Sequence, residues 1–298
     1  MSLLDVVARD GFAVVPIAAE QSQSPEALRD AAAASPFSFA ARLLGVEPLL
    51  VERQPIRPVD GGRSFASTRI DTPLHTDSQS FAGAPAAIQI LVCVKAAPRG
   101  GESTLVDGAA LLARVERDDP ALAAALFDVD RVQPFYFGEV RGPTVALRAG
   151  HLAWTVAPAS LGARDEVGAA LLKEIARTPR IVRALGAGEA LVASNHRMLH
   201  GRMPFEGDRE LVRLLVWLTE PLGADPRHVA RARAATPSMD RETTARLRAV
   251  LAILRGVPPA RVAFDAKIDE ATLYGWRDAF TSGGVAALAN AGTPRVSP

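Results

Sequence analysis

The sequence has a single cysteine, Cys93, which excludes an internal disulfide. It lies in the apolar run 88–94, so we expect a buried small side chain and a reducing compartment. No stretch reaches the roughly 20 apolar residues of a membrane helix, and no basic leader precedes an apolar run at the N-terminus. Lysine plus arginine number 34 against 33 aspartate plus glutamate, so no overall charge draws the protein to nucleic acid or to an anionic membrane. These absences predict a cytoplasmic protein without a membrane partner.

What the sequence does contain is a long series of short apolar segments bounded by glycine or proline. Such segments predict many short strands, and the helical patterns among them do not alternate regularly with strands as in a βαβ protein. We therefore predict an α+β fold with a double-stranded β-helix (jelly-roll) core and flanking helices. The predicted strands cover residues 11–15, 48–52, 87–96, 103–106, 131–137, 144–147, 151–156, 189–193 and 211–219. The predicted helices cover residues 25–34, 37–44, 108–116, 119–126 and 164–186.

The last quarter of the sequence differs in composition from the part before it. Residues 221–237 are rich in proline, alanine, arginine and glycine, which indicates a connecting segment. Three helical patterns follow this segment, at 239–255, 258–266 and 270–282. We therefore predict a jelly-roll domain over residues 1–222, and a linker with a small all-α module over 223–298.

Residues 258–277 resemble the helix-turn-helix of transposase-type DNA-binding proteins, chiefly through Ile-Asp-Glu-Ala-Thr-Leu-Tyr-x-Trp at 268–276. A recognition helix needs basic side chains to engage phosphates and base edges. This segment carries Glu270, Arg277 and Asp278 instead of a basic face. We therefore do not expect nucleic acid as a partner. The module is assigned to packing, to dimerisation in a homo-oligomer or to covering an active site.

Five histidines are present, and one of them stands beside an acid in a pattern suited to a metal. In His75-Thr76-Asp77 the imidazole and the carboxylate are two positions apart, so on extended backbone both point to one face. A third ligand would complete the two-histidine, one-carboxylate triad of non-haem iron oxygenases. Alone, a His-x-Asp pair occurs by chance in many chains. Structural or surface roles are expected for His151, His196 and His228.

Three sequence blocks extend this pair. They are 74–77, then 100–107 with the sequence Gly-Gly-Glu-Ser-Thr-Leu-Val-Asp, and then 195–213, which includes His200. In this order they resemble the taurine dioxygenase and TfdA-like family of Fe(II)- and 2-oxoglutarate-dependent dioxygenases. The resemblance covers roughly the first 220 residues. It implies that Asn195 orders the loop beside the distal ligand and that the iron ligands are His75, Asp77 and His200.

The same resemblance implies which residues bind the co-substrate, 2-oxoglutarate. Arg209 and Arg213 match an Arg-x-x-x-Arg pair, in which the first arginine binds the distal carboxylate and the second lies close to co-substrate or substrate. A guanidinium grips a carboxylate through two N–H donors, which lysine cannot do. A hydroxyl accompanies this arginine in the family. Serine stands at the usual threonine position here, so Ser103 and Thr104 both stay candidates.

The resemblance also implies a reaction. 2-Oxoglutarate and O2 are consumed, succinate and CO2 are released, and a C–H bond of an amino acid or natural-product intermediate is hydroxylated or otherwise oxidised, as in desaturation. Relatives that chlorinate have a small residue in place of the acid, so Asp77 indicates a hydroxylase and not a halogenase. The alternatives are a DNA-binding regulator with an oxygenase-like sensor domain, and a β-barrel protein that is catalytically silent or binds a different metal. Substrate contacts are expected from residues just before the first ligand: Arg63, Ser67, Thr68 and Arg69.

Overall fold

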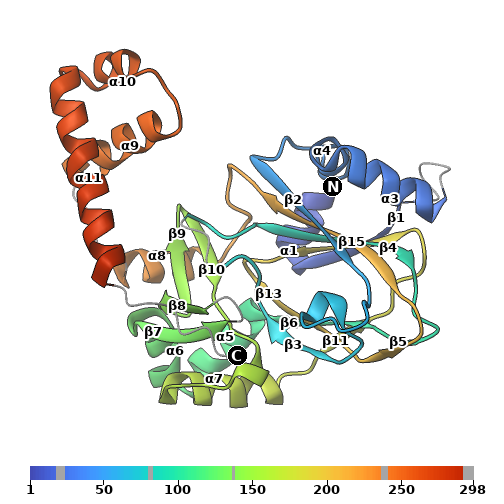
Figure 1. Cartoon of the computed structure of the whole chain (residues 1–298). Coiled ribbons are helices and arrows are strands. Elements are labelled where there is room, and N and C mark those ends of the chain that lie inside the picture. Colours follow the sequence, from blue (N-terminus) through green and yellow to red (C-terminus); the bar gives the residue numbers. More distant parts are fainter. Residues whose placement is uncertain (18–23, 80–82, 136–137, 236–240, 291–298) are drawn as a thin grey trace. The chain divides into compact units, whose positions relative to one another are not determined.

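Figure 1 shows a computed structural model of the chain, which describes residues 1–17, 24–79, 83–135, 138–235 and 241–290. The chain divides into two compact units, Met1–Thr236 and Pro237–Pro298. The strands of the first unit are β1 (Phe12–Pro16), β2 (Leu50–Ile56), β3 (Thr72–His75), β4 (Ile88–Lys95), β5 (Arg99–Gly100), β6 (Ser103–Asp107), β7 (Arg131–Phe135), β8 (Gly138–Gly142), β9 (Val145–Arg148), β10 (His151–Trp154), β11 (Ile181–Arg183), β12 (Glu189–Ser194), β13 (Met198–Arg202), β14 (Phe205–Glu206) and β15 (Glu210–Trp217). Its helices are α1 (Leu3–Asp10), α3 (Pro25–Ala34), α4 (Pro36–Leu44), α5 (Gly108–Asp118), α6 (Pro120–Asp128), α7 (Glu166–Arg177) and α8 (Pro226–Ala235), with single 3-10 turns η1 (Phe65–Ser67) and η2 (Ala159–Leu161).

Two antiparallel sheets form the centre of the first unit. One has the strand order β1-β12-β4-β15-β2 and the other the order β11-β6-β13-β3. Side chains of both sheets meet in one buried cluster, to which the first sheet contributes Leu191 and Leu211 and the second contributes Leu105 and Met198. The sheets therefore pack face to face, which is consistent with the predicted jelly-roll core.

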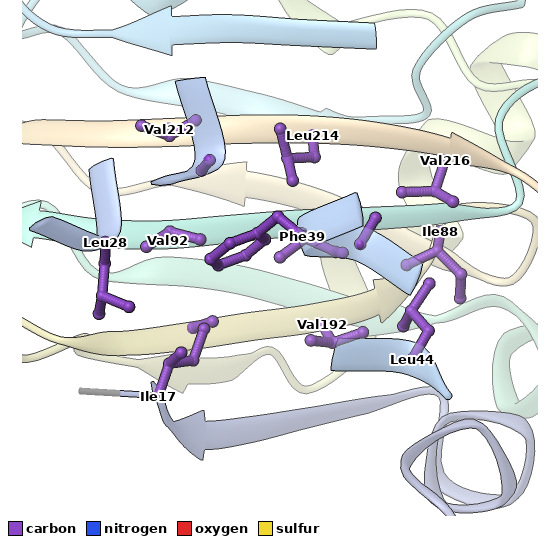
Figure 2. Close-up of a cluster of buried hydrophobic side chains, with 14 of the residues drawn as sticks. Ile17, Leu28, Phe39, Leu44, Ile88, Val92, Val192, Val212, Leu214 and Val216 are labelled. Carbon is purple, nitrogen blue, oxygen red and sulfur yellow. The ribbon is translucent and has the colours of Figure 1, made fainter. Parts of the chain in front are cut away.

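The outer face of the five-stranded sheet is covered by α1, α3 and α4, and Figure 2 shows the side chains that fill this layer. On β15, Val212, Leu214 and Val216 alternate toward the helices and are almost fully buried. Phe39 of α4 packs against them with 2% of its surface exposed. Each such side chain contributes roughly 1.5–3 kcal/mol through burial. Arg213, between two of these positions, consequently points to the opposite face, into the space between the sheets.

The four-stranded sheet follows the same rule. Its outer face buries Leu74, Val106 and Leu199 against the layer formed by α5, α6 and α7. Because strand side chains alternate, the residues next to these three face the other sheet. His75 and His200 are therefore directed inward by the apolar residues that precede them.

Three expectations about the helices are wrong or incomplete. The predicted helix 164–186 ends at Arg177, because Pro179 disfavours helical backbone at Thr178, and a strand, β11, follows. The segment expected to be a linker contains α8, which begins after Asp225, whose carboxylate accepts a hydrogen bond from the Arg227 amide at 2.8 Å. The helix α1 was not predicted, although Ser2 caps it and Gly11 ends it at a φ of 85°. Residues 136–137 and 239–240, also covered by predicted elements, lie outside the described residues.

The described residues of the second unit form the helices α9 (Arg241–Leu254), α10 (Pro259–Ala266) and α11 (Glu270–Asn290). They share a small core of Ala249, Val262, Ala263 and Leu273. Lys267, at a φ of 56°, ends α10, and Asp269 caps α11 by accepting a hydrogen bond from the Thr272 amide at 2.7 Å. Across the parts of the chain that the structure describes, no helix combines the length and apolar character needed to cross a membrane.

Candidate metal and co-substrate site

The structure brings His75, Asp77 and His200 together between the two sheets. His75 ends β3 and lies directly opposite His200 on β13, while Asp77 follows two residues after the end of β3. The Nε2 atom of His75 is 3.5 Å from Asp77 Oδ1, and the Nε2 atom of His200 is 3.4 Å from Asp77 Oδ2. All three ligand atoms lie within 4.8 Å of one another. Two imidazoles and one carboxylate converging from one side fit a single iron ion with open positions.

Neighbouring groups favour neutral imidazole rings with the lone pair on Nε2, which is the form that binds a metal. The Nδ1 atom of His75 lies 2.9 Å from the Pro73 carbonyl oxygen, so Nδ1–H donates and the lone pair is on Nε2. The side-chain amide nitrogen of Gln89 lies 3.1 Å from Nε2 of His200. Because an amide N–H only donates, it favours the tautomer with the lone pair at that atom. Burial lowers the pKa of His200, and the nearby His75 lowers it further, which keeps the ring neutral.

The carboxylate of Asp77 is held by two donors on the same oxygen. Oδ2 accepts a hydrogen bond from Gln89 Nε2 at 2.8 Å and one from Arg213 Nη1 at 2.7 Å. Burial by itself would raise the pKa of Asp77, but the charge of Arg213, which is the largest opposing influence, lowers it. The pKa of Asp77 is therefore well below its ordinary value. With Oδ2 occupied, Oδ1 is the oxygen that the ionised group can offer to a metal.

Asn195 fixes the main chain that carries Asp77. Its Oδ1 accepts a hydrogen bond from the Asp77 amide at 2.8 Å, and its Nδ2 donates to the carbonyl oxygens of Asp77 at 3.0 Å and Ala86 at 2.9 Å. Asn195 is fully buried. It therefore orders the loop that carries Asp77 through three backbone groups, whereas the resemblance implied this role for the loop beside the distal ligand. Gln89 was missed in the sequence, where its signal was a single amide in the otherwise apolar run 88–94.

Arg209 lies just before β15 with 7% of its surface exposed, and it lines the same cavity as both histidines. No hydrogen bond or ion pair joins its guanidinium to another of the residues described, although it stacks on the ring of Phe205 with 5.7 Å to the centroid. Burial lowers its pKa from the ordinary value. A buried guanidinium with unused donors beside a metal-ligand group is suited to an anionic ligand that carries a carboxylate.

The strand register separates the two candidate hydroxyls. Ser103 is opposite Arg202 on β13 and Thr104 is opposite Gly201, so their side chains point to opposite faces of the sheet. Ser103 lines the cavity with Arg209, whereas Thr104 lies toward a separate hollow beside α7. Of the two, Ser103 is the one that can meet a ligand held by Arg209.

The Gly-Gly segment before these hydroxyls makes room for Arg209. Gly100 and Gly101 have φ values of 73° and 81°. A Cβ at Gly100 would come within 2.2 Å of the Pro204 carbonyl oxygen, and one at Gly101 within 3.1 Å of Arg209 Nε. Both positions therefore require glycine, for backbone conformation and for space.

The residues expected on the substrate side do not line the cavity. Arg63 and Arg69 are exposed, and Arg69 Nε donates to the Gly207 carbonyl at 2.9 Å. Ser67 is hydrogen-bonded to Ser64, and the Thr68 hydroxyl is buried. The cavity is lined by Ile56, Phe65, Ala66, Thr72, His75, Leu91, Ser103, His200, Gly201, Arg202, Arg209 and Arg213.

The remaining histidines are buried and lie apart from the metal-ligand group. His196 and His151 pack ring to ring with 5.1 Å between centroids, and His196 Nε2 is 2.9 Å from the Pro85 carbonyl oxygen. Burial lowers the pKa of His196 to about 4. His228 contacts Glu116 at 3.0 Å. These contacts fit the structural roles expected for all three.

Comparison with known proteins places these observations in a family. The family model for the taurine catabolism dioxygenase TauD, TfdA family matches residues 3–215. Among solved structures, the chain is similar to asparagine oxygenase in complex with Fe(II), 2S,3S-3-hydroxyasparagine and succinate, with a TM-score of 0.51, 19% identity and coverage of 74% of this chain and 84% of that one. It is also similar to the non-haem iron oxygenase OrfP with Fe and α-ketoglutaric acid (TM-score 0.44, 18% identity, 61% and 62% covered) and to PvcB from Pseudomonas aeruginosa (0.43, 18%, 60% and 70%). No curated protein matches the sequence. The asparagine oxygenase match shows a shared fold.

Proposed function

This chain belongs to the TauD, TfdA family of dioxygenases, and from that premise we propose that it is an Fe(II)- and 2-oxoglutarate-dependent dioxygenase. It hydroxylates a C–H bond of a small molecule, an amino acid or a natural-product intermediate. In the balanced reaction, substrate, 2-oxoglutarate and O2 give hydroxylated product, succinate and CO2, with one oxygen atom in the product and the other in succinate. The activity is assigned to residues 1–222, apart from the C-terminal helical module.

One observation carries this proposal. His75 and His200 line the same cavity as a buried arginine with unused donors and the Ser103 hydroxyl, and Asp77 completes the ligand group beside the two histidines. A metal site alone suits many proteins, and a buried arginine alone is often structural. Their combination in one cavity fits a metal-chelating 2-oxo acid whose distal carboxylate reaches Arg209.

When bound, iron would supply the redox centre at which dioxygen is reduced while 2-oxoglutarate is decarboxylated. His75, His200 and Oδ1 of Asp77 would hold it from one side, leaving the cavity side open. Gln89 and Arg213 keep Oδ2 engaged, so the carboxylate presents one oxygen instead of two. Arg209 and Ser103 would orient the distal carboxylate of 2-oxoglutarate, and the apolar side chains of the cavity would limit access of water.

The acid at position 77 supports hydroxylation over halogenation. A carboxylate that binds iron there would occupy the coordination position that a halide would need beside the two histidines. The similar asparagine oxygenase structure contains a hydroxylated amino acid and succinate. This is the pair of product classes expected for the reaction proposed here.

The test is anaerobic binding followed by turnover. Fe(II) and 2-oxoglutarate together should produce a visible charge-transfer absorption that neither produces alone, and admission of O2 should then release succinate, faster with an accepted substrate. Asp77→Ala should abolish both signals, whereas Arg177→Met, at a position 70% exposed on α7, should leave them unchanged. Absence of the absorption and of succinate in the unmodified protein would refute the proposal. Tight binding of duplex DNA in that case would favour the regulator with a sensor domain.

A further inference from the structure

A second buried arginine lines the cavity, and the proposed reaction gives it no role. Arg202 lies two residues after His200 on β13 and shares its inward face, with 8% of its surface exposed. Its Nη1 donates to the carbonyl oxygen of Phe65 at 3.0 Å, and its Nη2 donates to those of Thr68, at 3.0 Å, and Ile70. All three acceptors belong to residues 65–70, which we call the cavity wall because Phe65 and Ala66 line the cavity.

Burying Arg202 is costly, since none of the described residues forms an ion pair with it. Three charge-assisted hydrogen bonds to the main chain offset this cost. Through these hydrogen bonds one rigid guanidinium connects carbonyl groups spread over six residues. A single ammonium group could not reproduce this geometry.

The cavity wall is tied to both halves of the proposed site. The Phe65 ring lies 6.2 Å from the ring of His75, between centroids. Phe205 donates its amide to the Arg69 carbonyl at 3.1 Å, and its ring is 4.9 Å from the Arg202 guanidinium and 5.7 Å from that of Arg209. The wall therefore faces the metal ligands on one side and rests on the co-substrate arginine through Phe205.

From these contacts we infer that Arg202 is a positioning residue, which clamps the cavity wall beside the metal ligands and so sets the shape of the substrate side of the cavity. Arg202 binds neither co-substrate nor substrate. Only the identity of the molecules bound in the cavity rests on the proposed function, because the clamp itself consists of contacts within the chain.

Hydrogen exchange measured by mass spectrometry tests the clamp in the full-length protein without any ligand. The amides of Val59 and Phe205 donate to carbonyl oxygens of the wall, and the amide of Ser67, in the wall, donates to the carbonyl oxygen of Ser64. In Arg202→Met these amides should exchange at least about tenfold faster than in the unmodified protein, while exchange in β4 and β15 stays unchanged. Arg202→Lys, which keeps the charge and the apolar stem, should also exchange faster. Arg177→Met serves as the matched control for losing an arginine.

Co-substrate binding separates positioning from binding. In both Arg202 variants the anaerobic Fe(II)–2-oxoglutarate absorption should keep its apparent Kd within about threefold, because Arg209 and Ser103 are unchanged. Wild-type exchange rates in Arg202→Met and Arg202→Lys would overturn the inference, and so would loss of the absorption in a variant that is otherwise folded. If Arg202→Met fails to fold, Arg202→Lys alone decides. If the unmodified protein shows no absorption, the proposed function fails, and the exchange rates still decide the clamp.

Discussion

Replacing Arg209 by methionine should change two properties of the protein in opposite directions. In the unliganded protein the guanidinium is buried with no hydrogen-bond partner among the described residues, so its removal relieves a desolvation cost. The free energy of unfolding of Arg209→Met without ligand should therefore equal or exceed that of the unmodified protein. Affinity for 2-oxoglutarate should fall, because removing one partner of a buried, hydrogen-bonded charge pair costs roughly 2–5 kcal/mol, or about 30-fold to several thousandfold in Kd.

Denaturant unfolding with Mn(II), a redox-inert stand-in for Fe(II), measures both effects. At a 2-oxoglutarate concentration of about 100 times its Kd, the ligand should stabilise the unmodified protein by about 2.7 kcal/mol. The same concentration should stabilise Arg209→Met by less than about 1 kcal/mol. Arg209→Lys should fall between them, since it keeps the charge and loses the bidentate geometry. If 2-oxoglutarate stabilises Arg209→Met fully, or if the unliganded variant is markedly less stable, then Arg209 is a structural cation and the assignment is wrong.

Three further predictions concern buried side chains around the site. Asn195→Ala should lower the free energy of unfolding by roughly 2–5 kcal/mol in urea and weaken metal binding, because buried backbone groups at Asp77 lose their partners. A small loss with unchanged metal affinity would contradict this. Burial raises the pKa of Cys93 to about 11, so an alkylating reagent at pH 8 should label it only after unfolding, and rapid native labelling would count against that burial. Burial lowers the pKa of His196 to about 4, so as the pH falls from about 6.5 to about 4 the unfolded state takes up a proton that the folded state does not. The free energy of unfolding should therefore decrease over this range, by at most roughly 3 kcal/mol. In His196→Asn the free energy of unfolding should depend less on pH over the same range.

The sequence was most informative where function depends on neighbouring residues. A His-x-Asp pair, a Gly-Gly segment and a distal histidine followed by arginine are short patterns, and the family model confirms the resemblance that they suggested. The inward direction of His75 and His200 also has a local cause, because each follows a leucine that packs against the helices on the outer face of its sheet.

The rest depends on register and on contacts between distant strands. Ser103 and Thr104 could not be ranked before β6 was paired with β13, since a shift of one residue exchanges their faces. Gln89 lies on β4 of the five-stranded sheet, whereas Asp77 follows β3 of the four-stranded sheet. Their hydrogen bond therefore depends on how the two sheets pack. The residues expected on the substrate side were chosen for their position just before the first ligand, but of that segment Phe65 and Ala66 line the cavity instead.

The helix errors have similarly specific causes. The helical pattern over 164–186 was extended past Thr178 even though Pro179 follows it. The composition of 221–237 concealed α8, whose buried Ala232 joins the core formed with α5, α6 and α7. Alanine and arginine have high helix propensity, so their abundance in this segment did not exclude a helix. The preceding Asp225-Pro226 was the local signal for a helix start.

Within the cavity wall, the hydrogen bonds of Arg202 all go to main-chain carbonyl oxygens, and every residue type has such an oxygen. Side chains at 65–70 can therefore change without removing a single acceptor of the clamp, provided that the backbone keeps its path. The part of the chain that we propose to shape the substrate side can thus vary in sequence while its attachment stays constant. For engineering, this means that new substrate preferences should be sought by varying Phe65 and Ala66 on an unaltered Arg202.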